Sequence, residues 1–376
     1  MNNMSRSDKR IIISGGGTGG HIFPAIAIAD ALKELQPDVE ILFVGAIGKM
    51  EMEKVPAAGY KIIGIPVRGL QRRLSIENVW LPFRLLASLL KAWKIIRKFK
   101  PDAVVGVGGY ASGPILGVAA MQGIPTLIQE QNSYAGITNR LLAKKVHKIA
   151  VAYPGMNKFF PTEKIILCGN PVRKDIQNLE GKRNEATTFF GLNALKTTVL
   201  VTGGSLGALT INESIEKLLP RLASLDIQMI WQCGKNYFPK AEIYLEEFSN
   251  SGIRIYPFIT RMDLAYAIAD LVVSRAGALA ISELCVAAKP AILIPSPNVA
   301  EDHQTHNALA LVKENAAVIL KDAEARGKLS YTIIELVNND VELKNLSANI
   351  RKMAFEDAAG TIANEILMIA AEKNRK

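Results

Sequence analysis

This sequence of 376 residues has few of the residues that build disulfides or metal centres. Its three cysteines, Cys168, Cys233 and Cys285, are far apart, and its four histidines show no HxxxH spacing. We therefore expect buried, reduced thiols and no metal site. No Asp-x-Asp motif occurs in the chain. No Gly-Lys-[Ser/Thr] follows a glycine run either, and this second absence excludes a P-loop.

Long apolar runs are also missing. No uninterrupted apolar stretch approaches the roughly 20 residues that span a bilayer. The first ten residues are polar and have no apolar centre, so we do not expect them to be a signal peptide. With 49% hydrophobic and 21% charged residues, the composition is that of a globular chain, and the length favours two domains.

Short β-branched, apolar runs alternate with helical patterns along the whole chain. We predict strands near residues 10–14, 40–44, 61–65, 102–106, 125–128, 147–151, 164–168, 197–202, 227–232, 253–255, 271–274, 291–294 and 317–319. We predict helices that include residues 20–35, 76–99, 136–144, 207–222, 278–287 and 303–314. This alternation predicts an α/β fold with two Rossmann-like domains, each a doubly wound parallel sheet, that face a cleft.

Glycine and proline near residues 169–173 mark the expected domain boundary. We expect an N-terminal domain of residues 1–170 and a C-terminal domain of residues 171–354. The tail over residues 340–372 is predicted to be wholly helical. Its last part, about residues 355–376, is expected to pack back on the N-terminal domain.

Two glycine-rich turns, residues 14–21 and 202–208, stand where a predicted strand gives way to a helix. Glycine allows a sharp bend there, and the helix that follows directs free N–H groups and a positive dipole end toward an anion. The first turn formally satisfies the dinucleotide fingerprint. However, the second strand ends Gly45-Ala46 without the acid that would hold a ribose. We therefore expect loops for a phosphate or diphosphate.

Polar side chains follow the same predicted strands. His21 stands at the helix start, where a neutral imidazole could act as a general base, although a backbone-satisfied cap is the alternative. A third glycine turn, residues 106–114, carries Tyr110. Residues 129–132, Gln-Glu-Gln-Asn, are suited to sugar hydroxyls or form an ordinary solvated loop. Glu283 lies one to two turns into a helix that opens with small residues, and it could reach a ribose.

The positive charge of the chain is concentrated in residues 61–100, which hold ten basic residues and one acid. Part of this segment must be a core helix. Its mixture of Trp and Phe with Arg and Lys also fits a surface that lies in a membrane interface. We rank nucleic acid lower because no reading module is recognisable. The candidate membrane contacts are Arg72, Arg73, Trp80, Phe83 and Arg84.

Six motifs occur together and in order: Gly15-Gly16-Gly17-Thr18-Gly19-Gly20-His21, Gly108-Gly109-Tyr110, Glu130-Gln131-Asn132, Gly169-Asn170-Pro171-Val172-Arg173, Gly203-Gly204-Ser205-x-Gly207-Ala208 and Ser274-Arg275-Ala276-Gly277-Ala278. Over essentially the whole chain, this set resembles the MurG family of peptidoglycan glycosyltransferases, which have the GT-B fold. The resemblance implies inverting, metal-independent transfer of N-acetylglucosamine from UDP-N-acetylglucosamine to the C4 hydroxyl of N-acetylmuramic acid in lipid I, which forms lipid II.

The resemblance also implies that residues 1–170 bind the acceptor and the membrane and that residues 171–354 bind the UDP-sugar. It further implies partners and a location. The partners are UDP-N-acetylglucosamine, lipid I and the anionic cytoplasmic membrane surface, with cell-wall synthesis proteins as further candidates. Neither a cofactor nor nucleic acid is implied. The expected location is the cytoplasmic face of the cell inner membrane, as a peripheral protein.

Site residues follow from the same motifs. His21 is the first choice for the base, and Glu283 is the second residue assigned to catalysis. Ser205 is implied to contact the diphosphate, Glu283 the ribose and the Ile259 backbone the uracil. The implied donor contacts are Thr18, Gly19, Gly20, Asn132, Arg173, Ser205, Ile259, Ala278, Leu279, Ala280, Ile281, Ser282, Glu283 and Gln304. The implied acceptor contacts are Gly17, Tyr110 and Asn139.

Three positions depart from the family pattern. Leu206 stands where Gln is frequent, Ala280 where Thr is usual and Ala111 where Val is common. Three other functions stay open at this point. They are a GT-B enzyme that glycosylates diacylglycerol, a sugar-nucleotide epimerase of the same fold, and a non-catalytic membrane-bound scaffold that binds a nucleotide.

Overall fold

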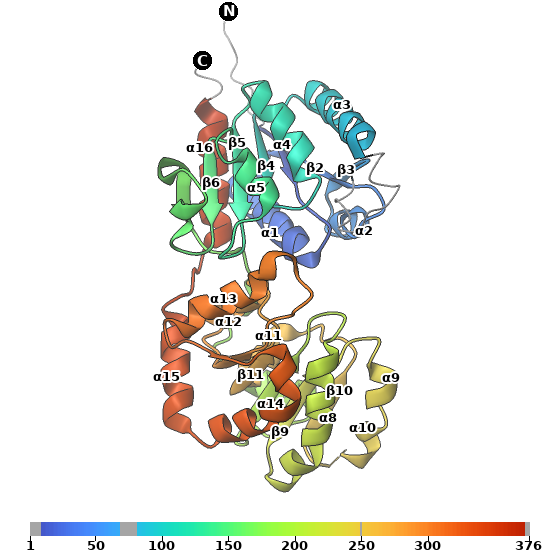
Figure 1. Ribbon diagram of the computed structural model, residues 1–376, viewed down its shortest axis with the longest axis vertical. Helices are drawn as coiled ribbons and strands as arrows, with labels where there is room; N and C mark the ends of the chain where they lie inside the picture. The colour runs from blue at the N-terminus through green and yellow to red at the C-terminus, as the bar shows by residue number, and fades with distance from the viewer. Residues whose placement is uncertain (1–8, 68–80, 249, 373–376) are drawn as a thin grey trace, which may run out of the picture. The chain divides into compact units, whose positions relative to one another are not determined.

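The computed structural model describes residues 9–67, 81–248 and 250–372 (Figure 1). The chain divides into two compact units, one of Met1–Pro171 with Asp357–Lys376 and the other of Val172–Glu356. Each unit is built on one parallel sheet flanked by helices. The prediction of an α/β fold with two doubly wound parallel sheets is confirmed.

The described part of the first unit has a seven-stranded sheet in the order β3-β2-β1-β4-β5-β6-β7. Its strands are β1 (Arg10–Ser14), β2 (Glu40–Ala46), β3 (Lys61–Ile65), β4 (Ala103–Gly106), β5 (Thr126–Glu130), β6 (Lys148–Val151) and β7 (Ile165–Leu167). Its α-helices are α1 (Gly19–Leu35), α2 (Glu51–Ala57), α3 (Leu81–Phe99), α4 (Ser112–Met121), α5 (Ile137–Leu142) and α16 (Ala358–Glu372). Two short 3-10 helices, Met156–Lys158 and Thr162–Lys164, precede β7.

Strand β1 explains why this sheet has a core on both faces. Ile11 and Ile13 belong to the cluster that holds α1 and α16, whereas Ile12 belongs to the cluster with α3 and α4. Successive side chains of a strand point to opposite faces, so three isoleucines in a row suit a strand covered on both sides. Ile12 is paired with Leu42 of β2 and Val104 of β4, which places β1 at the centre of the sheet.

The described part of the second unit has a six-stranded sheet in the order β10-β9-β8-β11-β12-β13. Its strands are β8 (Thr198–Thr202), β9 (Gln228–Gln232), β10 (Ile253–Tyr256), β11 (Leu271–Ser274), β12 (Ala291–Leu293) and β13 (Val318–Ile319). Its α-helices are α6 (Lys174–Gln177), α7 (Lys182–Phe190), α8 (Leu209–Ser224), α9 (Phe238–Ala241), α10 (Tyr244–Glu247), α11 (Met262–Ile268), α12 (Ala278–Val286), α13 (His303–Val312), α14 (Asp322–Val337) and α15 (Asp340–Arg351).

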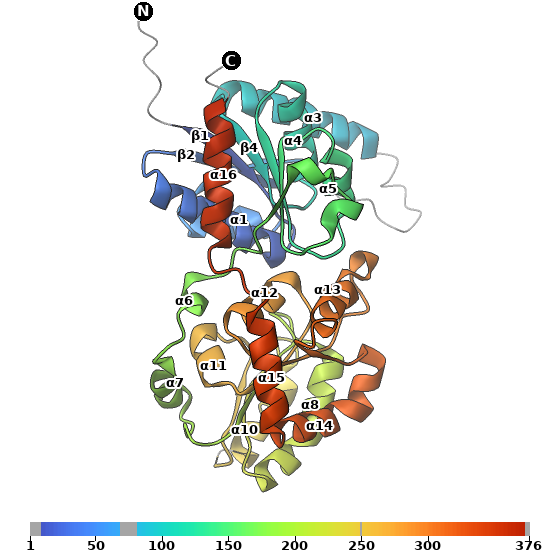
Figure 2. The ribbon, with the colours of Figure 1, turned by 90° about the vertical axis from the view of Figure 1, so that its left-hand side faces the viewer.

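The C-terminal tail is two helices, so the prediction that residues 340–372 are wholly helical is wrong for residues 352–357. Helix α15 ends at Arg351 and α16 begins at Ala358. The interruption falls where the chain leaves the second unit for the first. Asp357 caps the new helix, because its Oδ1 accepts a hydrogen bond from Gly360 N at 3.0 Å. Helix α16, red in Figure 2, then packs against α1 within the first unit.

Candidate active site

The glycine turns flank the point in each sheet where the strand order reverses. In the first unit the neighbours β1 and β4 lead into residues 15–18 and 107–111. In the second unit β8 and β11 lead into residues 203–208 and 275–277. Ligands of open α/β sheets bind outside the carboxyl ends of the strands at such a point. Each unit therefore offers one candidate binding edge.

The glycines at the first edge allow two loops to approach closely. Gly108 and Gly109 have φ values of +95° and +86°, which favour glycine. A Cβ at Gly109 would lie 2.4 Å from the carbonyl oxygen of Gly16, and one at Gly108 would lie 2.6 Å from Cδ2 of the His21 ring. The two loops and the imidazole thus fit together only because these positions carry no side chain.

The contacts of His21 favour one tautomer of its ring. Its Nδ1 lies 3.1 Å from the carbonyl oxygen of Gly16 and 3.4 Å from the Thr18 hydroxyl oxygen. A carbonyl oxygen can only accept, so Nδ1 carries the hydrogen and Nε2 keeps the lone pair. The ring lies in the first turn of α1, after the N-cap residue Thr18. With the hydrogen on Nδ1, Nε2 is the ring nitrogen that could take up a proton.

Glu51 is a residue of this edge that the sequence analysis missed. It is the first residue of α2 and is fully buried. Its carboxylate accepts hydrogen bonds from Gly17 N at 2.8 Å and Ala46 N at 2.9 Å. The Gly17 amide is therefore already engaged, so it is not among the N–H groups that the first loop can offer to a phosphate. An acid soon after the second strand was the available signal, but only the fold shows that it turns inward.

Residues 129–131 build the scaffold of the site, so the expectation that all four side chains of residues 129–132 face a sugar or solvent is wrong. Gln129, Glu130 and Gln131 are all buried. Gln129 Nε2 donates to Asn170 Oδ1 at 2.8 Å, and Gln131 Nε2 donates to the carbonyl oxygen of Val107 at 2.6 Å. The first bond ties β5 to the segment after β7, and the second ties the residue after β5 to the glycine turn after β4.

The carboxylate of Glu130 organises the segment that follows β5. It accepts hydrogen bonds from Asn139 Nδ2 at 2.9 Å, Gly136 N at 3.0 Å and Asn132 N at 3.1 Å. Burial raises the pKa of Glu130, and these bonds oppose the rise. Asn139 and Tyr110, two of the expected acceptor contacts, differ in exposure. Asn139 is buried and has no hydrogen-bond partner for its Oδ1 among the described residues, and Tyr110 is 55% exposed.

The second edge has a similar glycine turn. Gly204 and Gly207 have positive φ values, and a Cβ at Gly207 would lie 2.0 Å from the carbonyl oxygen of Cys233. The turn leaves Ser205 and Leu206 exposed. Gln232, which the sequence analysis missed, donates to the carbonyl oxygen of Gly204 at 3.0 Å and accepts from Ile259 N at 2.8 Å. Because the N–H of Ile259 is engaged, a backbone contact from Ile259 to a nucleobase would be made by its carbonyl group.

Helix α12 begins at Ala278, directly after the extended Gly277. Ala278, Leu279 and Ala280 are only partly buried, so the first turn can be approached. Ile281 is buried, and Ser282 Oγ donates to the carbonyl oxygen of Ala278 at 3.0 Å. In α13, Gln304 Oε1 accepts from Ser296 N at 2.8 Å, which fixes its orientation. The first-turn N–H groups of α12 make this helix start suited to an anion.

Glu283 is held by two side chains of the second unit. Arg173 Nε lies 3.3 Å from Glu283 Oε1, and the Tyr266 hydroxyl donates to Oε2 at 3.2 Å. Burial raises the pKa of Glu283, and the charge of Arg173 opposes this. Burial, with the nearby Glu283 carboxylate adding to it, raises the pKa of Tyr266 well above its usual value. Arg173 and Glu283, both predicted from sequence, therefore lie together, and Tyr266 is an addition.

Three of the predicted membrane residues, Arg72, Arg73 and Trp80, lie outside the described residues. Phe83 is 64% exposed on α3, and Arg84 is half-buried. Four exposed apolar residues of α3 form a stripe at helical spacing, namely Phe83, Leu86, Leu90 and Trp93, and Leu85 is exposed beside it. In the described ranges, no helix is both long and apolar enough to cross a membrane.

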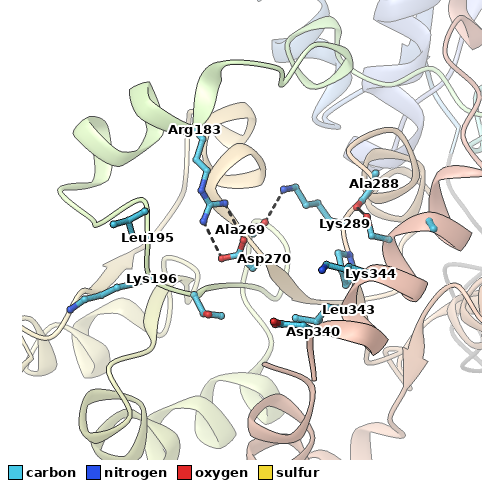
Figure 3. A pocket seen from close by; sticks show the side chains of 14 residues that line it. Arg183, Leu195, Lys196, Ala269, Asp270, Ala288, Lys289, Asp340, Leu343 and Lys344 are labelled. Atoms are coloured by element: carbon cyan, nitrogen blue, oxygen red, sulfur yellow. Dashed lines mark hydrogen bonds and ion pairs between the residues drawn. The ribbon is translucent and has the colours of Figure 1, made fainter. Parts of the chain in front are cut away.

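A cavity of about 510 Å³ lies at the opposite edge of the second sheet (Figure 3). It is lined by residues that precede β8, β11 and β12, among them Asp270 and Lys289. Arg183 pairs with Asp270 at 3.0 Å, and Lys289 Nζ donates to the carbonyl oxygen of Ala269 at 2.8 Å. Burial lowers the pKa of Lys289 to about 8. Because ligands bind at the other edge of such sheets, this cavity is not part of the candidate site.

Two family descriptions match the chain. Residues 11–151 match the glycosyltransferase family 28 N-terminal domain, and residues 198–362 match the glycosyltransferase family 28 C-terminal domain. A Parabacteroides distasonis protein is 57% identical over 364 residues, which cover 97% of this chain and 99% of that protein. It is named UDP-N-acetylglucosamine–N-acetylmuramyl-(pentapeptide) pyrophosphoryl-undecaprenol N-acetylglucosamine transferase.

Solved structures share the fold. Acinetobacter baumannii MurG has a TM-score of 0.79 and 28% identity, and the match covers 96% of this chain and 99% of that one. A UDP-N-acetylglucosamine 2-epimerase has a TM-score of 0.65 and 14% identity, with 97% and 96% covered. The second likeness concerns the fold alone, so an epimerase and a transferase are not distinguished by the architecture.

Proposed function

The chain belongs to glycosyltransferase family 28, and from this premise we propose that it transfers N-acetylglucosamine from UDP-N-acetylglucosamine to lipid I. The acceptor is the C4 hydroxyl of the N-acetylmuramyl unit, and the products are lipid II and UDP. The resemblance that the six motifs indicated is confirmed by relatives that match over almost their whole length.

The observation that carries the proposed chemistry is the orientation of His21. Its Nδ1–H is held by the carbonyl oxygen of Gly16, which leaves Nε2 to accept a proton. In the proposed step, Nε2 takes the proton of the C4 hydroxyl while that oxygen attacks the anomeric carbon of the donor. The bond from this carbon to the UDP oxygen breaks, and the configuration inverts. Tyr110 and Gly17 are proposed to contact the acceptor, and Asn139 supports them by holding Glu130.

The donor is proposed to bind the second unit. Ser205 and the first-turn amides of α12 suit the diphosphate, whose charge grows as UDP departs. The Glu283 carboxylate accepts hydrogen bonds from the ribose hydroxyls, and Arg173 and Tyr266 hold this carboxylate in place. The backbone of Ile259 contacts the uracil through its carbonyl group. Thr18, Gly19, Gly20 and Asn132 of the first unit and residues 278–282 and Gln304 of the second complete the proposed donor contacts.

The acceptor is a lipid, and we propose that the first unit meets it at the cytoplasmic membrane surface. The stripe of Phe83, Leu86, Leu90 and Trp93 on α3 offers exposed apolar area, and the segment around it is strongly basic. Apolar side chains among cations are typical of surfaces that lie in a membrane interface. Arg72, Arg73, Trp80 and Arg84 are proposed to join this contact.

The proposal is tested by transfer of labelled N-acetylglucosamine from the UDP donor to a short-chain lipid I analogue, with EDTA present. We expect product with the wild type and a loss of about 10²–10⁴-fold in rate with His21→Ala, while UDP-N-acetylglucosamine still binds. If the protein binds the donor but glycosylates diacylglycerol instead, lipid I is not its acceptor. If His21→Ala transfers the sugar at the wild-type rate, His21 is not the general base.

A further inference from the structure

The peptide group between Gly16 and Gly17 connects His21 to a buried carboxylate. Its carbonyl oxygen accepts from His21 Nδ1 at 3.1 Å, and its N–H donates to Glu51 Oε2 at 2.8 Å. Because a peptide group is planar and rigid, the two side chains are held by one fixed unit. We propose that Glu51 is a positioning residue that sets both the orientation and the proton affinity of His21 through this peptide. The inference rests on the proposed function, in which His21 Nε2 takes the acceptor's proton.

The fold leaves space for this carboxylate and for little else. A Cβ at Gly16 would lie 2.2 Å from the Glu51 carboxyl group, and one at Gly45 would lie 2.5 Å from Glu51 Cγ. The second carboxylate oxygen accepts from Ala46 N at 2.9 Å. Glu51 therefore connects the end of β2, the start of α2 and the loop after β1. Gly16 and Gly45, which have no Cβ, leave the space that the Glu51 side chain occupies.

Burying the charge of Glu51 costs desolvation free energy, which a side chain that only filled the space would not cost. A buried carboxylate loses its hydration, and no basic side chain pairs with Glu51 among the residues that the structure describes. Its two oxygens accept hydrogen bonds from Gly17 N and Ala46 N, which offset part of this cost. One of these two donors, Gly17 N, belongs to the peptide group that also bonds His21, so the carboxylate acts on a neighbouring group as well.

His21 is the neighbouring group that gains from this charge. A carboxylate at the N–H side of an amide polarises it, which makes the carbonyl oxygen a stronger acceptor. When Nε2 takes a proton, Nδ1–H becomes part of a cation, and its hydrogen bond to Gly16 becomes charge-assisted. Hydrolase triads place a carboxylate directly on the Nδ1–H of their histidine for the same purpose. Here one peptide group stands between the two.

The test replaces Glu51 by Gln, which keeps its size and removes its charge. We expect the kcat of the Glu51→Gln enzyme to fall about tenfold or more, with the KM for UDP-N-acetylglucosamine unchanged, because the second unit supplies most of the proposed donor contacts. Glu53→Gln is the matched control, since Glu53 is 80% exposed on the same helix and pairs with Lys54. Glu51→Asp, which keeps the charge but withdraws it by one methylene, should lose less.

A second readout separates positioning from a merely structural role. Nitrogen NMR of labelled histidines, with His21 assigned by its absence in His21→Ala, should show a Nδ1–H tautomer in the wild type. Glu51→Gln should shift this signal toward a tautomer mixture. A wild-type kcat together with an unchanged tautomer would overturn the inference. If the wild type fails to transfer the sugar, the proposed function is wrong, but the tautomer of Glu51→Gln still decides whether Glu51 positions His21.

Discussion

The fit of the His21 ring against Gly108 can be tested by adding one methyl group. In Gly108→Ala the new Cβ would lie 2.6 Å from Cδ2 and 2.7 Å from Nε2 of His21. Since carbon atoms pack at about 3.5–4.0 Å, the imidazole must move by roughly 1 Å. A displacement of this size at a reacting group costs about 10²-fold in rate. We therefore expect kcat to fall by about two orders of magnitude.

The same substitution also strains the backbone, and a second glycine isolates that effect. Gly108 has a φ of +95°, where alanine costs about 1–2 kcal/mol. Gly123, at the end of α4, has a φ of +66° and nothing within 4 Å of its virtual Cβ among the described residues. Gly123→Ala should therefore cost a similar free energy, which lowers the melting temperature by about 2–8 °C for a unit of this size, and it should leave kcat unchanged.

The assay is initial-rate transfer of labelled N-acetylglucosamine to the lipid I analogue at saturating donor, beside a melting curve for each variant. UDP-N-acetylglucosamine binding by calorimetry should stay close to the wild type in both variants, because neither Gly108 nor Gly123 is among the proposed donor contacts. If Gly108→Ala keeps a kcat within twofold of the wild type, the placement of the His21 ring has no catalytic meaning. An equal loss of kcat in Gly123→Ala would assign the effect to backbone strain.

Three further predictions concern other parts of the chain. Glu283→Gln should weaken UDP-N-acetylglucosamine binding by about 10–100-fold in calorimetry, since a hydrogen bond to a charged group contributes about 1.5–3 kcal/mol, and an unchanged Kd would contradict the ribose contact. Phe83→Asp with Leu90→Asp should weaken co-sedimentation with anionic vesicles about tenfold or more, whereas Met121→Asp on α4, equally exposed, should not. Burial lowers the pKa of Lys289 from 10.5 to about 8, so the unfolded chain binds this proton more tightly and stability rises between those pH values. Lys289→Met should thus raise the free energy of unfolding at pH 7 by about 1–3 kcal/mol, and denaturant titrations should show the gain shrinking by pH 10.

The strands and the glycine turns could be predicted from sequence because their causes are local. A run such as Ile11 to Ile13 fits only a strand buried on both faces, and every predicted strand overlaps an observed one. Arg173 and Glu283 are 110 positions apart in the chain, and only the family resemblance brought them into one site before the structure showed their contact.

The internal polar contacts could not be predicted because they depend on which segments meet. Nothing near Glu51 in the sequence indicates that its side chain enters the glycine loop. Gln129 and Gln131 have the composition of a solvated loop, yet their partners Asn170 and Val107 come from distant strand ends. The break before Asp357 was missed for a related reason, since the segment has no proline or glycine and the helix ends where the chain changes units.

The packing of α16 on α1 has a consequence for biosynthesis. The core of the first unit needs Ile362 and Ile366, which the ribosome adds after nearly the whole chain. Domains generally fold in the order of their synthesis, but here the unit that is begun first can be completed only last. Until α16 has been synthesised, the face of α1 that α16 covers remains open, so a nascent chain stalled before residue 357 presents an apolar surface to chaperones.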